Sequence, residues 1–329
     1  MTSSVTRLSD VIVPEVYSRY LTEDSIKRST LYRSGILTTD ARLNAFVAGG
    51  GTTFNIPFFQ RLSGDPQAIQ SSTTIETKKV TTSKMVARRL LFAKAWSAEE
   101  LASALSGENV MDAISAMVDE YWEWNMQRIL FAGIKGVIAD NIDNDSGDLV
   151  KDITTSGTPA AANKISADEV INTVALMGDH GDKLAAIAMH SVPYYTLVKA
   201  NLIDFEPNNT QNIGFGTYMG KTVFVSDQLT PDTDGSNSEY WTLLFKPGAI
   251  AYGESANGIT PVELDRTAST STDALYTRRQ FIMHPQGFKW VENSVADDMP
   301  TRSELEEAGN WDRVFEQKNC GFAVLISNG

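Results

Sequence analysis

The longest helical pattern in the chain lies between Asn109 and Ala132. Asn109 has the side chain of a helix N-cap, and Asp112 follows in the first turn, where the helix dipole favours an anion. At 1.5 Å per residue, a helix over 109–132 is about 36 Å long, which suits a spine for a sheet to pack against. Its stripe repeats every three or four residues, as one helix face requires, through Val110, Ile114, Met117, Val118, Tyr121, Trp122, Asn125, Ile129 and Ala132.

The residues on either side of this helix predict a short helix before it and loops after it. Ser97 and Glu100 have the spacing of a capping box, and Gly107 is placed to end the helix that they begin. The segment 136–166 is rich in Gly, Asp, Asn and Ser, which predicts a loop-rich crossing.

Part of this crossing resembles a calcium-binding loop. Asn141, Asp143 and Asp145 have the first three ligand spacings of such a loop. However, Ser146 stands where the loop needs glycine, and Asp152 where it needs glutamate. The pattern therefore favours a solvated acidic loop, and we predict no metal site.

Alternation of apolar and polar residues over 52–96 predicts a long two-stranded hairpin, polar on both faces. Such a hairpin is marginally stable alone, so we expect it to lie on another surface. Its basic side chains also allow a nucleic-acid interpretation, but no aromatic alternation accompanies them. Alternation in TTFNIPFF predicts a strand over 52–59. The two strands of the hairpin are marked by Ile75, Thr77 and Lys79, and by Lys84, Val86 and Arg88.

The rest of the chain alternates short helices and strands. Ser166 with Glu169 predicts a helix as far as Met177, and Ser191 is placed to cap a helix that follows a buried strand. We expect the strands at 259–266 and 276–284 to pair with the base of the hairpin and to pack on the spine helix. The further predicted elements are strands at 183–190 and 221–226, two strands split at Pro247-Gly248, a short helix beginning near Ser303 and a terminal strand after 319.

The charge is unevenly distributed along the 329 residues. The net charge is −13, which argues against a surface built mainly to bind nucleic acid. Residues 1–95 carry 13 Lys and Arg against 7 Asp and Glu (+6), whereas residues 96–329 carry 15 against 34 (−19). The basic third either covers its own acidic body or reaches an acidic neighbour, and we favour the neighbour. Residues 1–50 are interpreted either as a loosely packed helix or as an arm lying on other subunits.

We recognise no catalytic or metal-binding motif in the sequence. None of His180, His190 and His284 belongs to a metal-binding motif, and there is no G-x-S-x-G nucleophile motif. Cys320 is the only cysteine, so no intrachain disulfide can form, and its apolar surroundings indicate a small buried side chain. We therefore predict no catalytic, cofactor-binding or metal-binding residues. No apolar run is long enough to cross a bilayer, and no signal-peptide core is present.

The order of the segments and five short strings resemble the major capsid proteins of tailed double-stranded DNA bacteriophages with the Hong Kong 97 fold. The likeness spans nearly the whole chain. The strings are IPFFQRLSGD, AMHSVPYYTLVK, TYMGKTVFVSDQL, FIMHPQGFKWVE and GNWDRVFEQKN.

The resemblance implies an α+β fold and a structural role. The subunit is expected to form hexamers and pentamers of an icosahedral head that encloses double-stranded DNA, as a virion component assembled in the bacterial cytoplasm. The implied divisions are an N-terminal arm (1–51), an extended β-hairpin loop (52–96), a peripheral domain with the spine helix (97–150), an axial α/β domain (151–255) and a return to the peripheral domain with the C-terminal strand (256–329).

The implied partners are copies of the same chain, a portal and, in some cases, a cement or decoration protein, with packaged DNA bound only non-specifically and no membrane. Met1 leads almost directly into the arm, so we expect a separate scaffolding protein and no large propeptide. The residues expected at contacts between subunits are Lys78, Lys79, Lys84, Arg88 and Arg89 of the hairpin and Arg19 and Arg28 of the arm.

Two alternatives remain at this level. An encapsulin-type compartment shell would have the same fold with a protein cargo in place of DNA. A soluble α/β enzyme with unrecognised site residues would instead be a monomer or dimer with a deep pocket of titratable groups.

Overall fold

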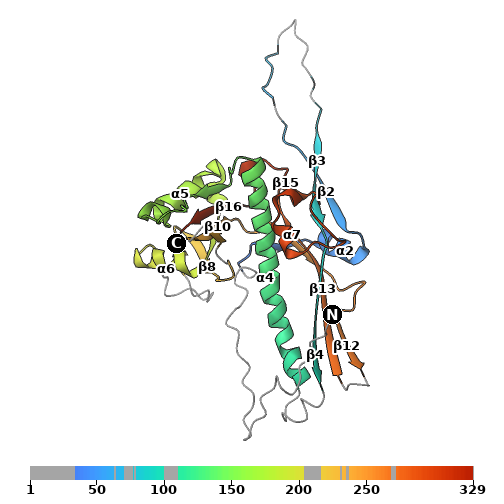
Figure 1. Ribbon diagram of the computed structural model, residues 1–329. Helices are drawn as coiled ribbons and strands as arrows, with labels where there is room; N and C mark the ends of the chain where they lie inside the picture. Colours follow the sequence, from blue (N-terminus) through green and yellow to red (C-terminus); the bar gives the residue numbers. More distant parts are fainter. Residues whose placement is uncertain are drawn as a thin grey trace.

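One long helix, α4 (Val110–Asn144), stands between two groups of strands in the computed structural model (Figure 1). A sheet with two helices lies on one side of α4, and longer strands lie on the other, with a hairpin extending past one end (Figure 1). The structure describes residues 34–62, 64–69, 77, 79–99, 110–203, 216–229, 232–234, 237–267 and 272–328.

The predicted spine helix is confirmed, but it is longer than its sequence pattern suggested. It continues through Gly133 and Gly136 to Asn144, a total length of about 52 Å. The prediction of a loop beginning at residue 136 is therefore wrong. Ile134, Val137 and Ile138 are fully buried, so tertiary packing of this turn outweighs the low helix propensity of the two glycines.

The calcium-loop pattern also has a helical explanation. Asn141 and Asp143 lie in the last turn of α4, where the Asn141 side chain bonds the chain that follows. Its Oδ1 accepts from the Leu149 amide at 3.0 Å, and its Nδ2 donates to Asp148 at 2.8 Å. Within the described residues no group of three His, Cys, Asp or Glu side chains is placed to hold a metal ion.

A five-stranded sheet packs beside the lower half of α4. Its longest strand pairs with three others, and it is fixed to the helix by a hydrogen bond from Trp122 Nε1 to Thr277 Oγ1 at 3.1 Å. The strands are β1 (Leu37–Thr39), β11 (Ile250–Glu254), β13 (Thr272–Pro285), β12 (Val262–Thr267) and β4 (Leu90–Glu99).

Strand β4 replaces the short helix predicted from Ser97. Residues Leu90–Glu99 pair with β13 over ten positions, with Ser97 opposite Ala274. The helix prediction was wrong here because a capping-box spacing is local, whereas the pairing with β13 is long-range. The expected packing of strand 276–284 on the spine is confirmed, with β4 as the paired neighbour of β13.

The second sheet has seven strands and carries α5 (Ala167–Ala175) and α6 (Ser191–Lys199). The last strand of the chain lies inside it, with all six residues buried. In order the strands are β5 (Val150–Asp152), β16 (Phe322–Ser327), β10 (Asn237–Phe245), β6 (Ala186–Met189), β8 (Lys221–Val225) and β7 (Thr217–Tyr218), with β9 (Asp232–Asp234) paired to β10.

The two predicted helix caps have different outcomes. Ser166 caps α5 as expected, accepting from the Glu169 amide at 3.4 Å. The cap of α6 is His190 and not Ser191, because His190 Nδ1 accepts from the Val192 amide at 3.2 Å. Ser191 is instead the first residue of that helix.

The hairpin consists of β2 (Thr53–Phe59) and β3 (Thr82–Arg88), paired from Thr53–Arg88 to Phe59–Thr82. The strand predicted over 52–59 is confirmed as β2. The hairpin prediction, however, placed the partner of strand 84–88 at 75–79, and this placement is wrong because Thr77 and Lys79 lie in no strand. Strand β2 forms earlier because Phe54 and Ile56 pack against a small buried cluster made of Leu43, Val47, Ala87, Ala251 and Ile282.

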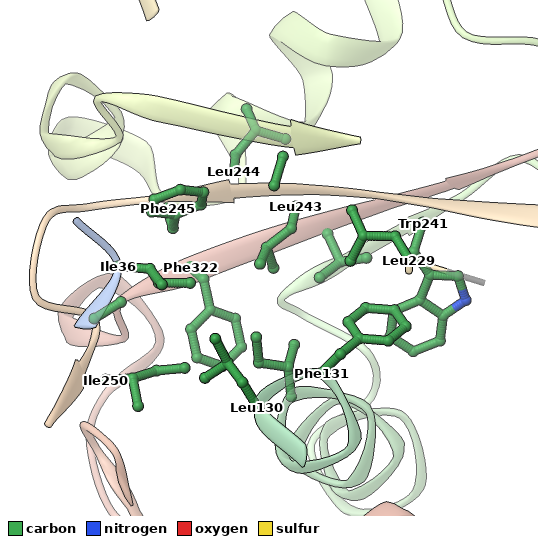
Figure 2. Packing of buried hydrophobic residues seen from close by; sticks show 14 of the residues in the cluster. Ile36, Leu130, Phe131, Leu229, Trp241, Leu243, Leu244, Phe245, Ile250 and Phe322 are labelled. Atoms are coloured by element: carbon green, nitrogen blue, oxygen red, sulfur yellow. The ribbon is translucent and has the colours of Figure 1, made fainter. Parts of the chain in front are cut away.

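The main core lies between α4 and the seven-stranded sheet. Leu130 and Phe131 of α4 face Leu243 and Phe245 of β10 and Phe322 of β16 (Figure 2). The remaining described elements are α2 (Ala41–Gly49), η2 (Ala161–Asn163), η3 (Gly178–Lys183), β14 (Phe288–Trp290), α7 (Arg302–Glu306), η4 (Ala308–Asn310), β15 (Trp311–Arg313) and η5 (Gln317–Asn319).

A buried carboxyl group near the C-terminal end of α4 makes the stability depend on pH. Asp140 is 1% exposed, and its Oδ1 accepts from Asn144 Nδ2 at 2.7 Å. Burial raises the pKa of Asp140 to about 6, and the charge of Asp145 adds to this effect. Arg313 acts in the opposite direction but does not cancel the desolvation.

We expect Asp140→Asn to stabilise the chain at neutral pH. The folded state holds this proton more tightly than the unfolded state, so its contribution is complete below pH 4 and is lost as the pH rises through about 6. The loss corresponds to about 3 kcal/mol at pH 7. Urea unfolding of both chains from pH 4 to 8 should show a stability difference that grows with pH. A constant difference would contradict the assignment, because other groups, such as the fully buried His284, titrate in both chains.

Candidate assembly surface

Strands β2 and β3 point past one end of α4 (Figure 1). Four apolar residues at the end of β2 and in the described segments between the two strands are exposed to solvent. Phe59 is 77% exposed, Leu62 75%, Ile69 86% and Val80 54%. We call these four residues the tip cluster. Large apolar side chains exposed along one segment favour contact with another surface, because leaving them in water costs free energy.

The base of the same hairpin is firmly attached to the body. The Phe58 ring meets the Phe315 ring edge-on at 4.9 Å, and Met85 Sδ accepts from the Gly287 amide at 3.3 Å. Ala87 is fully buried. The paired strands are therefore held on the body along their length, and the tip cluster lies at their far end and in the segments beyond it.

The basic residues predicted at subunit contacts fall into two groups. Lys79 and Lys84 are exposed, and no described residue forms an ion pair with either. Lys78, Arg19 and Arg28 lie outside the described residues.

Arg88 and Arg89 are engaged within the chain. The Arg88 side chain is 5% exposed, pairs with Glu292 at 2.9 Å and donates to the Asp298 carbonyl. Arg89 donates to the carbonyls of Phe46 at 2.9 Å and Val47 at 3.0 Å, and burial lowers its pKa. Both arginines bind the base of the hairpin to the body, which leaves the two lysines as the solvent-facing charges of β3 and the segment before it.

Sequence reasoning did not identify the tip cluster. The hairpin was interpreted as polar on both faces, although Phe58 and Phe59 are adjacent and so must point to opposite faces of β2. Two adjacent aromatic residues in a strand with only one packed face were the available signal.

A groove lies between α4 and the five-stranded sheet at the opposite end of the molecule. It has a volume of about 230 Å³ and includes Trp122, Ile259 and Val262 in its lining. Beside it, Val262 and Leu264 of β12 are 57% and 60% exposed. Strand β12 lies at an edge of its sheet, and edge strands with apolar side chains are open to further contacts.

The groove is lined by two carboxylates, Asp119 and Glu254, and by two arginines, Arg278 and Arg279. Asp119, whose side chain is 94% exposed, lies 3.8 Å from Arg279, and Glu254 lies 3.6 Å from the same guanidinium. One arginine is thus shared by two carboxylates. The highly exposed carboxylate of Asp119 is complementary in sign to Lys79 and Lys84.

A serine, a histidine and an aspartate meet at the start of α6 but do not form a nucleophile. Ser191 Oγ is 3.5 Å from His190 Nδ1, and His190 Nε2 is 3.6 Å from Asp227. However, Nδ1 already accepts from the Val192 amide, and burial lowers the pKa of His190. The ring acts as a helix cap, so it is not free to serve as a base.

Cys320 is also unsuited to nucleophilic chemistry. Burial raises the pKa of its thiol to about 12, so the reactive thiolate is scarce at neutral pH.

None of the helices described is both long and apolar enough to cross a membrane.

The sequence of this chain matches known phage capsid proteins over most of its length. The model of the family described as "Gp13-like: Major capsid protein 13-like" matches residues 54–321. The chain is 38% identical over 316 residues to the major capsid protein of Bacillus phage SPP1, covering 95% of each.

Two solved structures share the fold at low sequence identity. The capsid of Ralstonia phage GP4 superposes with a TM-score of 0.63 at 9% identity, covering 100% of this chain and 98% of the other. The capsid asymmetric unit of cyanophage Pam1 gives a TM-score of 0.61 at 12% identity, covering 96% of each.

Proposed function

Because the chain belongs to the major capsid protein 13-like family, we propose that its tip cluster and its groove join neighbouring copies in the wall of a closed shell. The chain is the major capsid protein of a tailed phage and a virion component, with the α+β fold of phage capsids that the sequence resemblance predicted. It is a structural protein and not an enzyme, so the enzyme alternative was wrong.

The exposed tip cluster carries this proposal. Burying a large apolar side chain contributes about 2 kcal/mol to association. Burying four of them therefore offsets much of the entropy that two subunits and their side chains lose when they associate. The described part of their own body does not cover them, since each is more than half exposed. A neighbouring copy offers a groove with the exposed Val262 and Leu264 beside it.

Charge complementarity sets the orientation of this contact. Lys79 and Lys84 approach the rim of the neighbour's groove, where Asp119 and Glu254 lie. Lys78, Arg19 and Arg28 belong to the same basic leading third and are proposed to act similarly. Arg88 and Arg89 contribute by fixing the hairpin base, from which the tip reaches out.

We propose the domain division that the sequence suggested, with the five-stranded sheet and α4 as the peripheral part and the seven-stranded sheet as the axial part. Two observations refine its boundaries. Strand β16 belongs to the sheet of the axial part, and β4 to the sheet of the peripheral part.

Hexamers and pentamers of this subunit are proposed to build an icosahedral head around double-stranded DNA in the host cytoplasm. A scaffolding protein, a portal and, where present, a decoration protein are the proposed partners. The acidic body, −19 over residues 96–329, supports weak and non-specific contact with DNA, because like charges repel.

Electron microscopy of the purified chain, alone and co-expressed with its scaffolding protein, tests this function. We expect closed shells, or rings of five and six subunits that convert to shells. A chain that sediments only as a monomer under both conditions would contradict the proposal.

A further inference from the structure

A small basic pocket lies at the edge of the seven-stranded sheet, far in sequence from the hairpin. It is formed by η3, η5 and the turn after β10, and its volume is about 50 Å³. This exceeds the roughly 10–15 Å³ that one water molecule requires. Half of its lining residues are basic, in a chain of net charge −13: the lining is Met177, His180, Lys183, Leu184, Lys246, Lys318, Asn319 and Cys320.

Backbone carbonyls hold two of these basic side chains in place. His180 Nδ1 is 2.7 Å from the Lys318 carbonyl, and Lys246 Nζ donates to the Asn319 carbonyl at 3.4 Å. Both carbonyls belong to η5, so one short segment orients groups from η3 and from the end of β10. The donors of the pocket are therefore positioned before any ligand arrives.

The positive charge of the pocket is only partly neutralised by the described chain. Asp179 pairs with Lys318 at 2.8 Å, with both side chains well exposed to solvent. No described carboxylate pairs with Lys183 or Lys246. Burial lowers the pKa of Lys246, and the nearby charge of Lys183 lowers it further.

An anion would relieve this repulsion, because two like charges in a partly desolvated site each disfavour the charged form of the other. We propose that the pocket binds one small tetrahedral oxyanion of the phosphate class, contacted by Lys183 and Lys246. The ligand is either free inorganic phosphate or a phosphate group of nucleic acid. This inference goes beyond the shell-building role and does not depend on it.

Calorimetric titration of the purified full-length chain with inorganic phosphate tests the site. We expect binding with a dissociation constant below about 1 mM, and no comparable heat from chloride at matched ionic strength. Lys246→Met and Lys183→Met should each weaken binding about tenfold or more, since each removes a charge-assisted hydrogen bond. Lys183 is exposed, so its replacement leaves the fold intact.

Lys199→Met is the matched control, because Lys199 is an exposed lysine at the end of α6 that does not line the pocket. It should bind phosphate as the unmodified chain does. A short DNA duplex that competes with phosphate, and loses this ability in Lys183→Met, would identify nucleic acid as the source. A duplex that does not compete would identify the free anion. No phosphate binding, or an equal loss in all three variants, would overturn the proposal.

Discussion

Serine at all four tip-cluster positions, Phe59, Leu62, Ile69 and Val80, is expected to stop shell formation while the subunit stays folded. These side chains are between 54% and 86% exposed in the isolated subunit, so the subunit loses little when they become polar. In the proposed contact they are buried, and each replacement removes about 2 kcal/mol from it. A shell repeats this contact at every subunit, so the loss is multiplied through the assembly.

Sedimentation velocity and electron microscopy would separate assembly from folding. The quadruple variant should keep the thermal unfolding midpoint of the unmodified subunit and give no shells. Phe59→Ser and Ile171→Ser form a matched pair of single variants, since Ile171 is 52% exposed on α5, away from the hairpin. Only Phe59→Ser should impair assembly. Normal shells from the quadruple variant would show that the tip cluster makes no essential contact.

In the same contact, we expect the lysines to contribute less binding free energy than the tip cluster. Lys79 and Lys84 are exposed, and exposed ion pairs contribute about 0–1 kcal/mol each and are screened by salt. The lysines therefore steer and orient the approach of the hairpin, while the tip cluster supplies most of the affinity.

Elements with a sustained periodic pattern could be predicted from the sequence. The spine helix, the cap at Ser166, the short helix beginning near Ser303 and the terminal strand all have local signals that tertiary packing reinforces. The wrong predictions fall where a residue far away in the sequence determines the secondary structure. Ser97 has the local signal of a helix start, but its neighbour Ala274 in β13 makes it a strand residue.

The surface residues show the same limit. Five basic residues of the hairpin look alike in sequence, yet Arg88 and Arg89 are held by groups from residues 46, 47, 292 and 298 of the same chain. Nothing local distinguishes them from Lys79 and Lys84. The tip cluster could have been suspected from adjacent Phe58 and Phe59, but which of the two is covered depends on Phe315, far along the chain.

Gly136 illustrates why the length of α4 was underestimated. Glycine within a helical pattern usually costs about 1 kcal/mol relative to alanine, and it was interpreted as the end of the spine. Here the missing side chain lets α7 and β15 approach the helix. Trp311 Nε1 donates to the Leu305 carbonyl at 2.9 Å directly against Gly136, so the glycine is required by tertiary contact and not by backbone conformation.

Gly136→Ala is therefore expected to destabilise the subunit strongly, by about 3 kcal/mol or more. The added methyl group would lie 2.6 Å from Trp311 Nε1 and would also overlap the Leu305 carbonyl, which belongs to the backbone and cannot rotate away. Gly133→Ala, one turn earlier, is the control, because its methyl group would meet only Trp311 Cζ2 at 3.9 Å. It should raise stability by up to about 1 kcal/mol through helix propensity. Urea unfolding of the unassembled chains gives both values. Equal stabilities of the two variants would mean that α7 does not pack on α4 through this glycine.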